Sequence, residues 1–209
     1  MSGKIKILII LIFSFFLMLS CVDLKQPHPS IKRYVLEYEV PEFSGYEPLD
    51  GVIKIDTFSA APAYNTRRIV YSSGNYERES YIYHKWDENP GEIVTHLLGR
   101  DIRQSGLFRG VILPGERVRG FSYRLGGTLE EFYESDEENK WAGVLSLTVT
   151  LVSEKDGESG DRVIFQKNYR TSEPCERKNP AALAKALSDG LKKISSVLVS
   201  DMYKAAKQN

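Results

Sequence analysis

The sequence predicts an α+β fold, a single domain in which two main helices pack on a mixed, mostly antiparallel β-sheet. Several short segments alternate apolar and polar residues with a period of two, as strands with one buried face do. Two segments, residues 89–106 and 179–202, instead carry an apolar stripe at helical spacing. The 209-residue length, less a leader peptide, suits one hydrophobic core.

The first half of the chain contains the first predicted strands. Residues 31–40 (IKRYVLEYEV) form a first strand, and residues 52–58 (VIKIDTF) form a second after a turn-rich connection. Residues 67–86 read as a hairpin, because Gly74 and Asn75 at its centre tolerate the positive φ of tight turns. This hairpin is the most aromatic part of the chain.

Both predicted helices begin with an asparagine–proline pair, at residues 89–90 and 179–180. Asparagine is a favoured N-cap, and proline suits the first helical turn, where its missing N–H costs nothing. Asp87 is an alternative N-cap for the first helix, and Gly106 is placed to end it. Each helix has one apolar stripe and is expected to pack on the sheet. The stripes consist of Ile93, Val94, Leu97, Leu98 and Ile102, and of Leu183, Leu187, Leu191, Ile194, Leu198 and Met202.

The second half of the chain contains four further predicted strands, at residues 107–113, 121–133, 140–152 and 162–169. The third alternates most clearly between apolar and small polar residues, which predicts one face on the core and one toward solvent. Short polar segments connect the last three strands, so we expect neighbours to pair antiparallel. A meander is the simplest topology.

The N-terminal segment resembles the signal peptide of a bacterial lipoprotein. Lys4 and Lys6 precede an apolar run at residues 7–19, which is short for a permanent transmembrane helix of about 20 residues. Ser20 and Cys21 then follow as in a lipobox, although the two residues before them depart from the usual box. We therefore expect residues 1–20 to be a signal peptide and Cys21 to be lipidated with fatty acyl chains such as palmitate.

Three segments follow from this interpretation: the signal peptide, a lipidated tether at residues 21–30 with two prolines, and a folded domain at residues 31–209. Several acyl chains make a durable anchor, since each buried CH₂ contributes about 0.8 kcal/mol. Val22, rather than aspartate, after the cysteine indicates an outer-membrane destination. In the alternative interpretation the chain is secreted or tethered otherwise, and Cys21 is incidental.

Charge and cysteine content narrow the functional classes. The chain has 28 basic and 28 acidic residues, and without Lys4 and Lys6 a net charge of about −2 remains, so nothing attracts nucleic acid. With Cys21 acylated, Cys175 has no intramolecular partner, and a structural disulfide is not expected. We expect Cys175 to be an inert loop cysteine, the alternative being a nucleophile activated by a nearby base.

No catalytic, metal-binding or cofactor-binding motif is recognisable in the sequence. The spacings C-x-x-C, H-x-x-x-H, H-E-x-x-H and G-x-S-x-G do not occur. The glycine pair in RLGGTL (residues 124–129) lacks phosphate-loop spacing, and inside a strand it is typical of a bulge or bend. The carboxylates of LEEFYESDEEN (residues 129–139) are expected to form a solvated hairpin tip. We therefore expect no catalysis, no metal and no cofactor.

Taken in order along the chain, a series of segments resembles the family of ABC-type transport auxiliary lipoproteins. These lipoproteins accompany MCE-type lipid transport systems such as the paraquat-inducible operon. The resemblance implies a small α+β domain, anchored at the periplasmic face of the outer membrane. It also implies an MCE-domain protein and an ABC transporter permease and ATPase complex as partners. The segments are YVL (34–36), VIKIDTFSAAPAYNTRRIVY (52–71), YIYHKWDENP (81–90), DIRQSGLF (101–108), YRLGGTLEEFY (123–133) and PAALAKALSDGLKKISSVL (180–198).

If one surface contacts such a partner, the aromatic hairpin is the best candidate, because tyrosine and arginine are favoured at interface centres. The alternative is that these aromatic residues are ordinary core or cross-strand pairs. The candidate residues are Tyr64, Arg67, Arg68, Tyr81 and Tyr83.

Two other functions stay open at this point. A lipoprotein scaffold or chaperone for envelope secretion or outer-membrane assembly would share the anchor and the fold. A periplasmic hydrolase would use Cys175 or an acidic pair. The sequence does not decide whether the protein forms a homo-oligomer.

Overall fold

The computed structural model describes residue 3, residues 29–137 apart from 73 and 75, residues 140–154 and residues 162–208. Two units are distinguished, Met1–Ser30 and Ile31–Asn209, and all the elements below belong to the second. The predicted signal peptide and Cys21 lie outside the described residues. Among those residues, no helix combines the length and the apolar character needed to cross a bilayer.

Three long strands form the main part of the sheet: β7 (Tyr123–Glu137), β8 (Lys140–Ser153) and β9 (Arg162–Pro174). They pair antiparallel in the order β7-β8-β9, which confirms the predicted meander for this part of the chain. In β8 the side chains of Leu145, Leu147, Val149 and Leu151 are buried as expected. Trp141 is only partly buried, and Val144 and Ser146, on the face expected to be toward solvent, are buried as well. The long central strand offers a continuous apolar surface to the helices.

The other edge of β7 pairs with three short strands in succession: β2 (Leu49–Ile55), β3 (Ser59–Ala60) and β4 (Arg68–Ser72). All three run parallel to β7, and β6 (Phe108–Ile112) runs parallel to β2. The simple meander is therefore wrong for this half of the sheet. Alternation identifies the buried face of a strand, but it does not identify the strand that pairs with it.

The predicted hairpin is confirmed as β4 and β5 (Glu79–Trp86), which pair antiparallel. The first strand is much shorter than the predicted strand at residues 31–40. Strand β1 covers only Lys32–Tyr34, and it pairs parallel with β5. After Tyr34 the chain leaves the sheet, and the buried Leu36 joins the core as part of an irregular segment.

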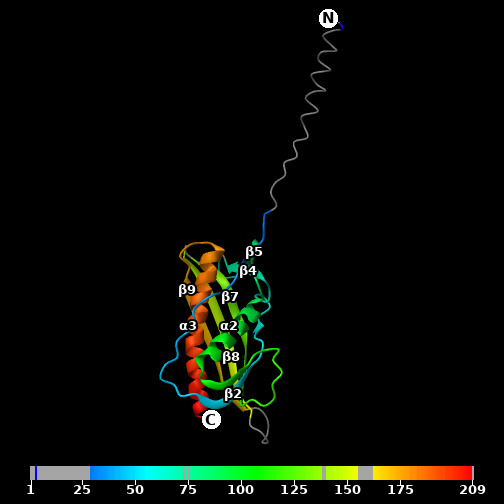
Figure 1. The fold of residues 1–209 in the computed structure, drawn as a ribbon. Helices are drawn as coiled ribbons and strands as arrows, with labels where there is room; N and C mark the ends of the chain where they lie inside the picture. Colours follow the sequence, from blue (N-terminus) through cyan, green and yellow to red (C-terminus); the bar gives the residue numbers. More distant parts are fainter. Residues whose placement is uncertain are drawn as a thin grey trace. The chain divides into compact units, whose positions relative to one another are not determined.

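Both helices follow the predicted boundaries closely. Helix α2 (Pro90–Ser105) ends at Gly106, which has a left-handed φ of 66°. Helix α3 (Pro180–Lys207) is five residues longer than its apolar stripe suggested, and the Asn179 side chain caps it by accepting a hydrogen bond from Ala182 N at 2.9 Å. The helices contact each other and the sheet, and both lie in front of the sheet in Figure 1.

One hydrophobic core fills the space between the sheet and the helices. It includes the whole apolar stripe of each helix and the inward-facing side chains of the strands. Its largest fully buried side chains include Trp86, Phe132, Ile53, Ile55, Ile69, Leu98, Ile102 and Leu107.

Two predictions about β7 are wrong in detail. The glycine pair Gly126 and Gly127 keeps regular register with β8, and the irregularity lies further on, between Leu129 and Glu131. Glu134 lies in the segment expected to be a solvated acidic tip, yet only 1% of its surface is exposed. The sheet extends further along this segment than expected, because β4 pairs with β7 at Glu134, and the Tyr81 hydroxyl contacts the buried carboxylate.

Candidate functional site

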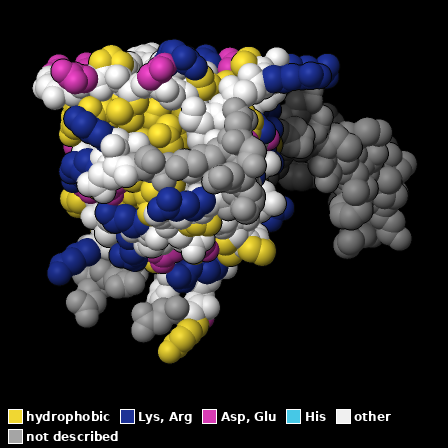
Figure 2. All heavy atoms as spheres, turned by 90° about the horizontal axis from the view of Figure 1, so that it is seen from below, with side chains coloured by type: hydrophobic (Ala, Val, Ile, Leu, Met, Phe, Trp, Pro, Cys, Tyr) yellow, Lys and Arg dark blue, Asp and Glu magenta, His cyan; other side chains and the backbone are white. Residues whose placement is uncertain are grey.

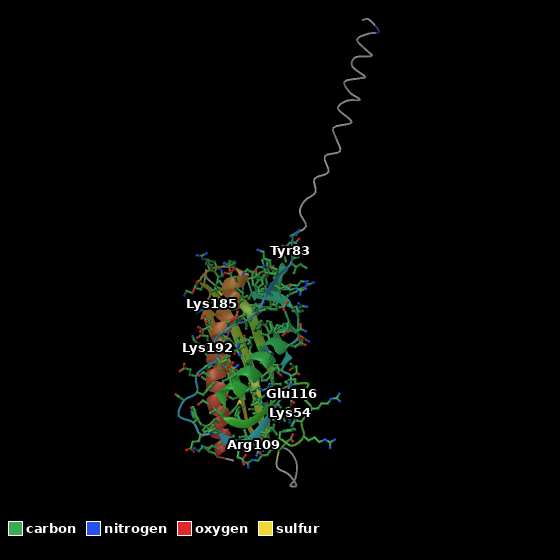
Figure 3. All side chains as sticks on the ribbon, in the orientation of Figure 1. Lys54, Tyr83, Arg109, Glu116, Lys185 and Lys192 are labelled. Atoms are coloured by element: carbon green, nitrogen blue, oxygen red, sulfur yellow. The ribbon has the colours of Figure 1, made fainter. Side chains whose placement is uncertain are left out.

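The β4–β5 hairpin and β1 together form the end of the domain at which the chain enters it. Strand β1 runs parallel to β5, with Lys32 opposite His84 and Tyr34 opposite Trp86. The N-terminal ends of both strands therefore lie at the same end of the domain, and both strands run away from it. The residues just before β1, and those just before β5, therefore lie at that end. Tyr83 marks it in Figure 3, away from Lys54 and Arg109.

Strand β5 contains a large bulge, in which apolar side chains are exposed to solvent. Val70 pairs with Ser80, and Arg68 pairs with Lys85. Between these two pairs β4 covers two residue steps and β5 covers five, so β5 contains three extra residues. The extra residues bend the strand out of regular pairing. Within this bulge, Ile82 is 74% exposed.

Four exposed apolar side chains gather at this end, and we call them the hairpin patch: Ile31, Tyr76, Ile82 and Tyr83. They are half of the eight large hydrophobic residues that are exposed among the described residues. Tyr76, in the connection between β4 and β5, is almost fully exposed at 98%. Exposed apolar residues concentrated at one end are typical of an interaction site, whereas scattered single ones are ordinary.

Aromatic side chains pack beneath the patch. The Tyr81 ring lies 5.0 Å from the Tyr71 ring and 5.7 Å from the His84 ring, measured between centroids. The Tyr34 hydroxyl lies 2.8 Å from His84 Nδ1 and so joins β1 to β5. These contacts hold β5 against its neighbouring strands β1 and β4 and so restrict the movement of the bulge.

A buried carboxylate lies under the same hairpin. The Tyr81 hydroxyl donates a hydrogen bond to Glu134, at 3.2 Å from Oε2 and 3.3 Å from Oε1. Burial raises the pKa of Glu134, while the hydrogen bond from Tyr81 and the charge of Lys178 partly offset that rise. Burial and the neighbouring Glu134 in turn raise the pKa of Tyr81 well above its usual range.

The five residues predicted to contact a partner differ in how far they are exposed. Tyr64 is only 7% exposed and stacks on Tyr133 with 6.0 Å between ring centroids, so its ring is part of the hydrophobic core. Tyr81 is half-buried, as described above. The exposed members are Arg67, Arg68 and Tyr83, and a partner contact through them stays a prediction.

The two arginines differ in their surroundings. Arg67 donates a hydrogen bond from Nε to the carbonyl oxygen of Trp86 at 3.3 Å, and its Nη2 lies 3.8 Å from Asp87. Arg68 begins β4 with an exposed side chain, for which the described residues supply no ion pair. Arg68 is therefore the freer of the two to contact another molecule.

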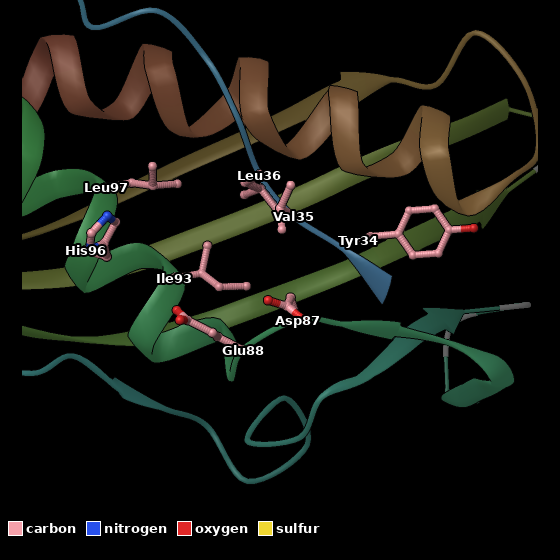
Figure 4. Close-up of a pocket in the computed structure, with 8 residues that line it drawn as sticks. All are labelled: Tyr34, Val35, Leu36, Asp87, Glu88, Ile93, His96 and Leu97. Atoms are coloured by element: carbon pink, nitrogen blue, oxygen red, sulfur yellow. The ribbon is translucent and has the colours of Figure 1, made fainter. Parts of the chain in front are cut away.

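A shallow cleft lies between the segment after β1 and the first turns of α2 (Figure 4). It has a volume of about 170 Å³, and a second hollow of about 450 Å³ shares Glu88 and His96 with it. Leu36, Ile93 and Leu97 give the first cleft an apolar lining. The volume of the first cleft is below the roughly 300–1,000 Å³ usual for small-molecule sites, so this cleft suits a side chain better than a cofactor. The second hollow lies within that range, but polar side chains such as Glu92 and Thr95 form much of its lining, whereas small-molecule sites are mostly apolar.

Cys175 has the environment of an unreactive thiol. It is partly buried, and burial together with the nearby Glu134 raises its pKa to about 11. A thiol with so high a pKa is almost entirely protonated at neutral pH and is a poor nucleophile. Within the described residues, no group of three histidine, cysteine or carboxylate side chains could hold a metal ion.

The opposite end of the domain has a mixed, charged surface. Figure 2 views this end, where basic side chains are spread over the surface with acidic and hydrophobic ones between them. Arg109 pairs with Asp50 at 2.8 Å, and Arg103 pairs with Glu116 at 2.8 Å. These pairs are solvent-exposed and contribute little to stability.

Comparison with known proteins gives a family match and several structural neighbours. The family model of the ABC-type transport auxiliary lipoprotein component matches residues 34–198. No curated protein matches the chain.

Among solved structures, protein XCC0632 from Xanthomonas campestris, a DUF330 protein, aligns with a TM-score of 0.75 and 18% identity, over 85% of this chain and 97% of its own. The hypothetical protein CT253 from Chlamydia trachomatis aligns with a TM-score of 0.56 and 8% identity, over 77% of this chain and 100% of its own. At these identities the structural likeness concerns the fold.

Proposed function

The chain belongs to the family of ABC-type transport auxiliary lipoprotein components, and from this premise we propose that it is a non-catalytic docking subunit of an MCE-type lipid transport system. Lipidation of Cys21 would hold it at the periplasmic face of the outer membrane. Its domain would bind the MCE-domain protein there, and through that protein the permease and ATPase complex.

The observation that carries this proposal is the extent of the family match. Residues 34–198 include nearly every helix and strand of the domain, from the end of β1 to the last third of α3. The match therefore concerns the whole fold rather than one short motif. The lipobox-like sequence before Cys21 supports the anchor independently.

An anchored docking subunit makes physical sense for lipid transport. The acyl chains of a lipid cannot cross an aqueous space unshielded, because each exposed CH₂ costs about 0.8 kcal/mol, so a protein conduit is needed. The far end of the conduit must stay near its target membrane. A domain on a short tether keeps a bound partner there at a high effective concentration.

Crosslinking in intact cells, followed by mass spectrometry of the proteins captured with the anchored chain, tests the proposal. We expect an MCE-domain protein and its transporter among the captured proteins, and both should be lost with Cys21→Ala, which removes the anchor. Capture of secretion or outer-membrane assembly components instead would favour the scaffold alternative and contradict the transport role.

The partner contact can be tested at Arg68. We expect Arg68→Glu to reduce co-purification of the MCE-domain protein, because reversing an exposed charge in an interface introduces repulsion. Arg117→Glu is the matched control, since Arg117 is an exposed arginine in the connection between β6 and β7 for which, as for Arg68, the described residues supply no ion pair. Equal co-purification of the MCE-domain protein with both folded variants would contradict the prediction that the hairpin is the surface that binds it.

A further inference from the structure

We propose that the hairpin patch inserts into the headgroup region of the bilayer that holds the lipid anchor, so that the domain rests on the membrane through the β5 bulge. This inference depends on the anchored state in the proposed function, because it requires Cys21 to be acylated. It adds a defined contact between the folded domain and lipid, made by Ile31, Tyr76, Ile82 and Tyr83.

The length of the tether limits how far this end of the domain can lie from the membrane. Nine residues separate Cys21 from Ile31, so even a fully extended tether spans at most about 35 Å. Ile31 immediately precedes β1, and it is 53% exposed. Since β1 and β5 lead inward from the same end, the tether reaches the domain beside the bulge and the hairpin tip.

The chemistry of the patch suits the interface of a bilayer. Ile82 is an aliphatic side chain that gains free energy when it leaves water. Tyr76 and Tyr83 have an apolar ring and a polar hydroxyl, and such side chains prefer the level of the lipid headgroups. The bulge projects Ile82 from a strand that Tyr81 and Glu134 hold in place, so little ordering is needed on contact.

Charges around the patch are mixed. Lys32 and Arg78 are exposed basic side chains at this end, and Glu77 and Glu79 are exposed acidic ones. Asp136, which pairs with Lys178, lies at the same end because β7 runs parallel to β4 there. We therefore expect the contact to rely on apolar insertion and to change little with salt or with the fraction of anionic lipid.

A bilayer accounts for the patch better than a second protein does. The patch consists of only four exposed apolar side chains among exposed charged residues, whereas most stable protein interfaces bury about 800 Å² on each partner. The tether also keeps this end of the domain within about 35 Å of the anchor, so the patch can reach the lipid surface without any further partner. A protein covering the patch is kept as an outcome of the test below.

The experiment uses the full-length acylated protein in phosphatidylethanolamine–phosphatidylglycerol vesicles. Cys175→Ser removes the internal thiol, and an environment-sensitive fluorophore is attached to Ile82→Cys, Tyr76→Cys or Val118→Cys in separate samples. Val118 is a matched control, because it is a similarly exposed apolar residue in the connection between β6 and β7. Sedimentation with the vesicles first reports whether the protein is anchored.

We expect blue-shifted emission at positions 82 and 76, quenching of both by lipids that carry a nitroxide near the headgroup, and neither effect at position 118. Sedimentation without quenching at positions 82 and 76 would overturn the membrane contact and leave the proposed function intact. A blue shift without lipid quenching would assign the patch to a contact with a second copy of the chain, the only other protein present, and would also overturn the membrane contact. Quenching at all three positions would show non-specific adsorption, and failure to sediment would contradict the anchor itself.

Discussion

Ser195 Oγ donates a hydrogen bond to Asp101 Oδ2 over 2.6 Å and thereby joins helix α3 to helix α2 inside the domain. The Tyr38 hydroxyl donates to the same oxygen at 2.7 Å, and Arg100 donates to Oδ1 at 2.9 and 2.8 Å. Asp101 is fully buried, so four donors from three segments satisfy one carboxylate. Burial and the neighbouring Asp101 raise the pKa of Tyr38 far above its usual range, which keeps its hydroxyl a donor.

We expect Asp101→Ala to lower the free energy of unfolding by about 3–5 kcal/mol, because it leaves the Arg100 charge, the buried Ser195 hydroxyl and the partly buried Tyr38 hydroxyl without their acceptor. Urea denaturation followed by tryptophan fluorescence measures the change. Asp189→Ala is the control, since it removes an exposed pair with Lys185 and should cost at most about 1 kcal/mol. Similar losses for the two variants would show that the Asp101 network contributes little.

The pH dependence of stability tests the burial of Glu134. Its pKa is raised in the folded state, so folding disfavours the charged form, and the cost appears as the pH rises above the unfolded value of about 4.3. Glu134→Gln removes this cost while keeping an acceptor for Tyr81. We expect the stability of the variant relative to the wild type to increase between about pH 4 and pH 7.

Denaturation at several pH values provides this measurement. Glu130→Gln is the control, because Glu130 is an exposed glutamate in the same strand. A stability difference between Glu134→Gln and the wild type that does not change with pH would contradict the raised pKa of Glu134.

The reactivity of Cys175 provides a third prediction. A rise in its pKa from 9.0 to about 11 leaves about a hundredfold less thiolate at pH 8 than in the unfolded chain. We expect alkylation by iodoacetamide to be slower in the folded protein by about this factor, and to accelerate in denaturant. Mass spectrometry of the modified peptide over time checks it, and rapid labelling of the native protein would reopen a catalytic role.

The sequence predicted the elements that depend on local signals. The asparagine–proline pairs at residues 89–90 and 179–180 marked the helix starts, and the period-two alternation of residues 140–152 identified β8. These signals are properties of neighbouring residues. The parallel pairing of β7 with β2, β3 and β4 has no comparable local signal, because it depends on which long-range partners fit the core best.

The candidate site was predicted only in part, for the same reason. Aromatic content drew attention to the hairpin, but composition does not show that Tyr64 turns inward or that Ile82 turns outward. The bulge that exposes Ile82 is a property of the β4–β5 register, which no single strand determines. Asp101 did leave a signal, since it falls four residues after Leu97 on the apolar face of α2, although its partner Ser195 could not be identified from that spacing.

The glycine pair in β7 allows a comparison between adjacent positions. A Cβ on Gly127 would lie 2.4 Å from the carbonyl oxygen of Thr148 and 2.7 Å from the Phe58 ring, so backbone or core must shift. A Cβ on Gly126 would meet nothing closer than 3.7 Å, which is an ordinary contact. Gly127 is therefore required because the Thr148 carbonyl oxygen and the Phe58 ring occupy the space that a Cβ would need, rather than because the strand bends there.

We expect Gly127→Ala to lower the free energy of unfolding by about 1–3 kcal/mol, the usual cost of overpacking a core, whereas Gly126→Ala should change it by less than about 0.5 kcal/mol. Urea denaturation of the two variants side by side measures the difference. If Gly127→Ala is costly because of Phe58, then Phe58→Leu, which shortens the obstructing side chain, should reduce the additional cost of Gly127→Ala in a double-mutant cycle. Equal costs for the two glycines would contradict this steric explanation, and the absence of coupling between Gly127 and Phe58 would assign the cost to the Thr148 carbonyl oxygen alone.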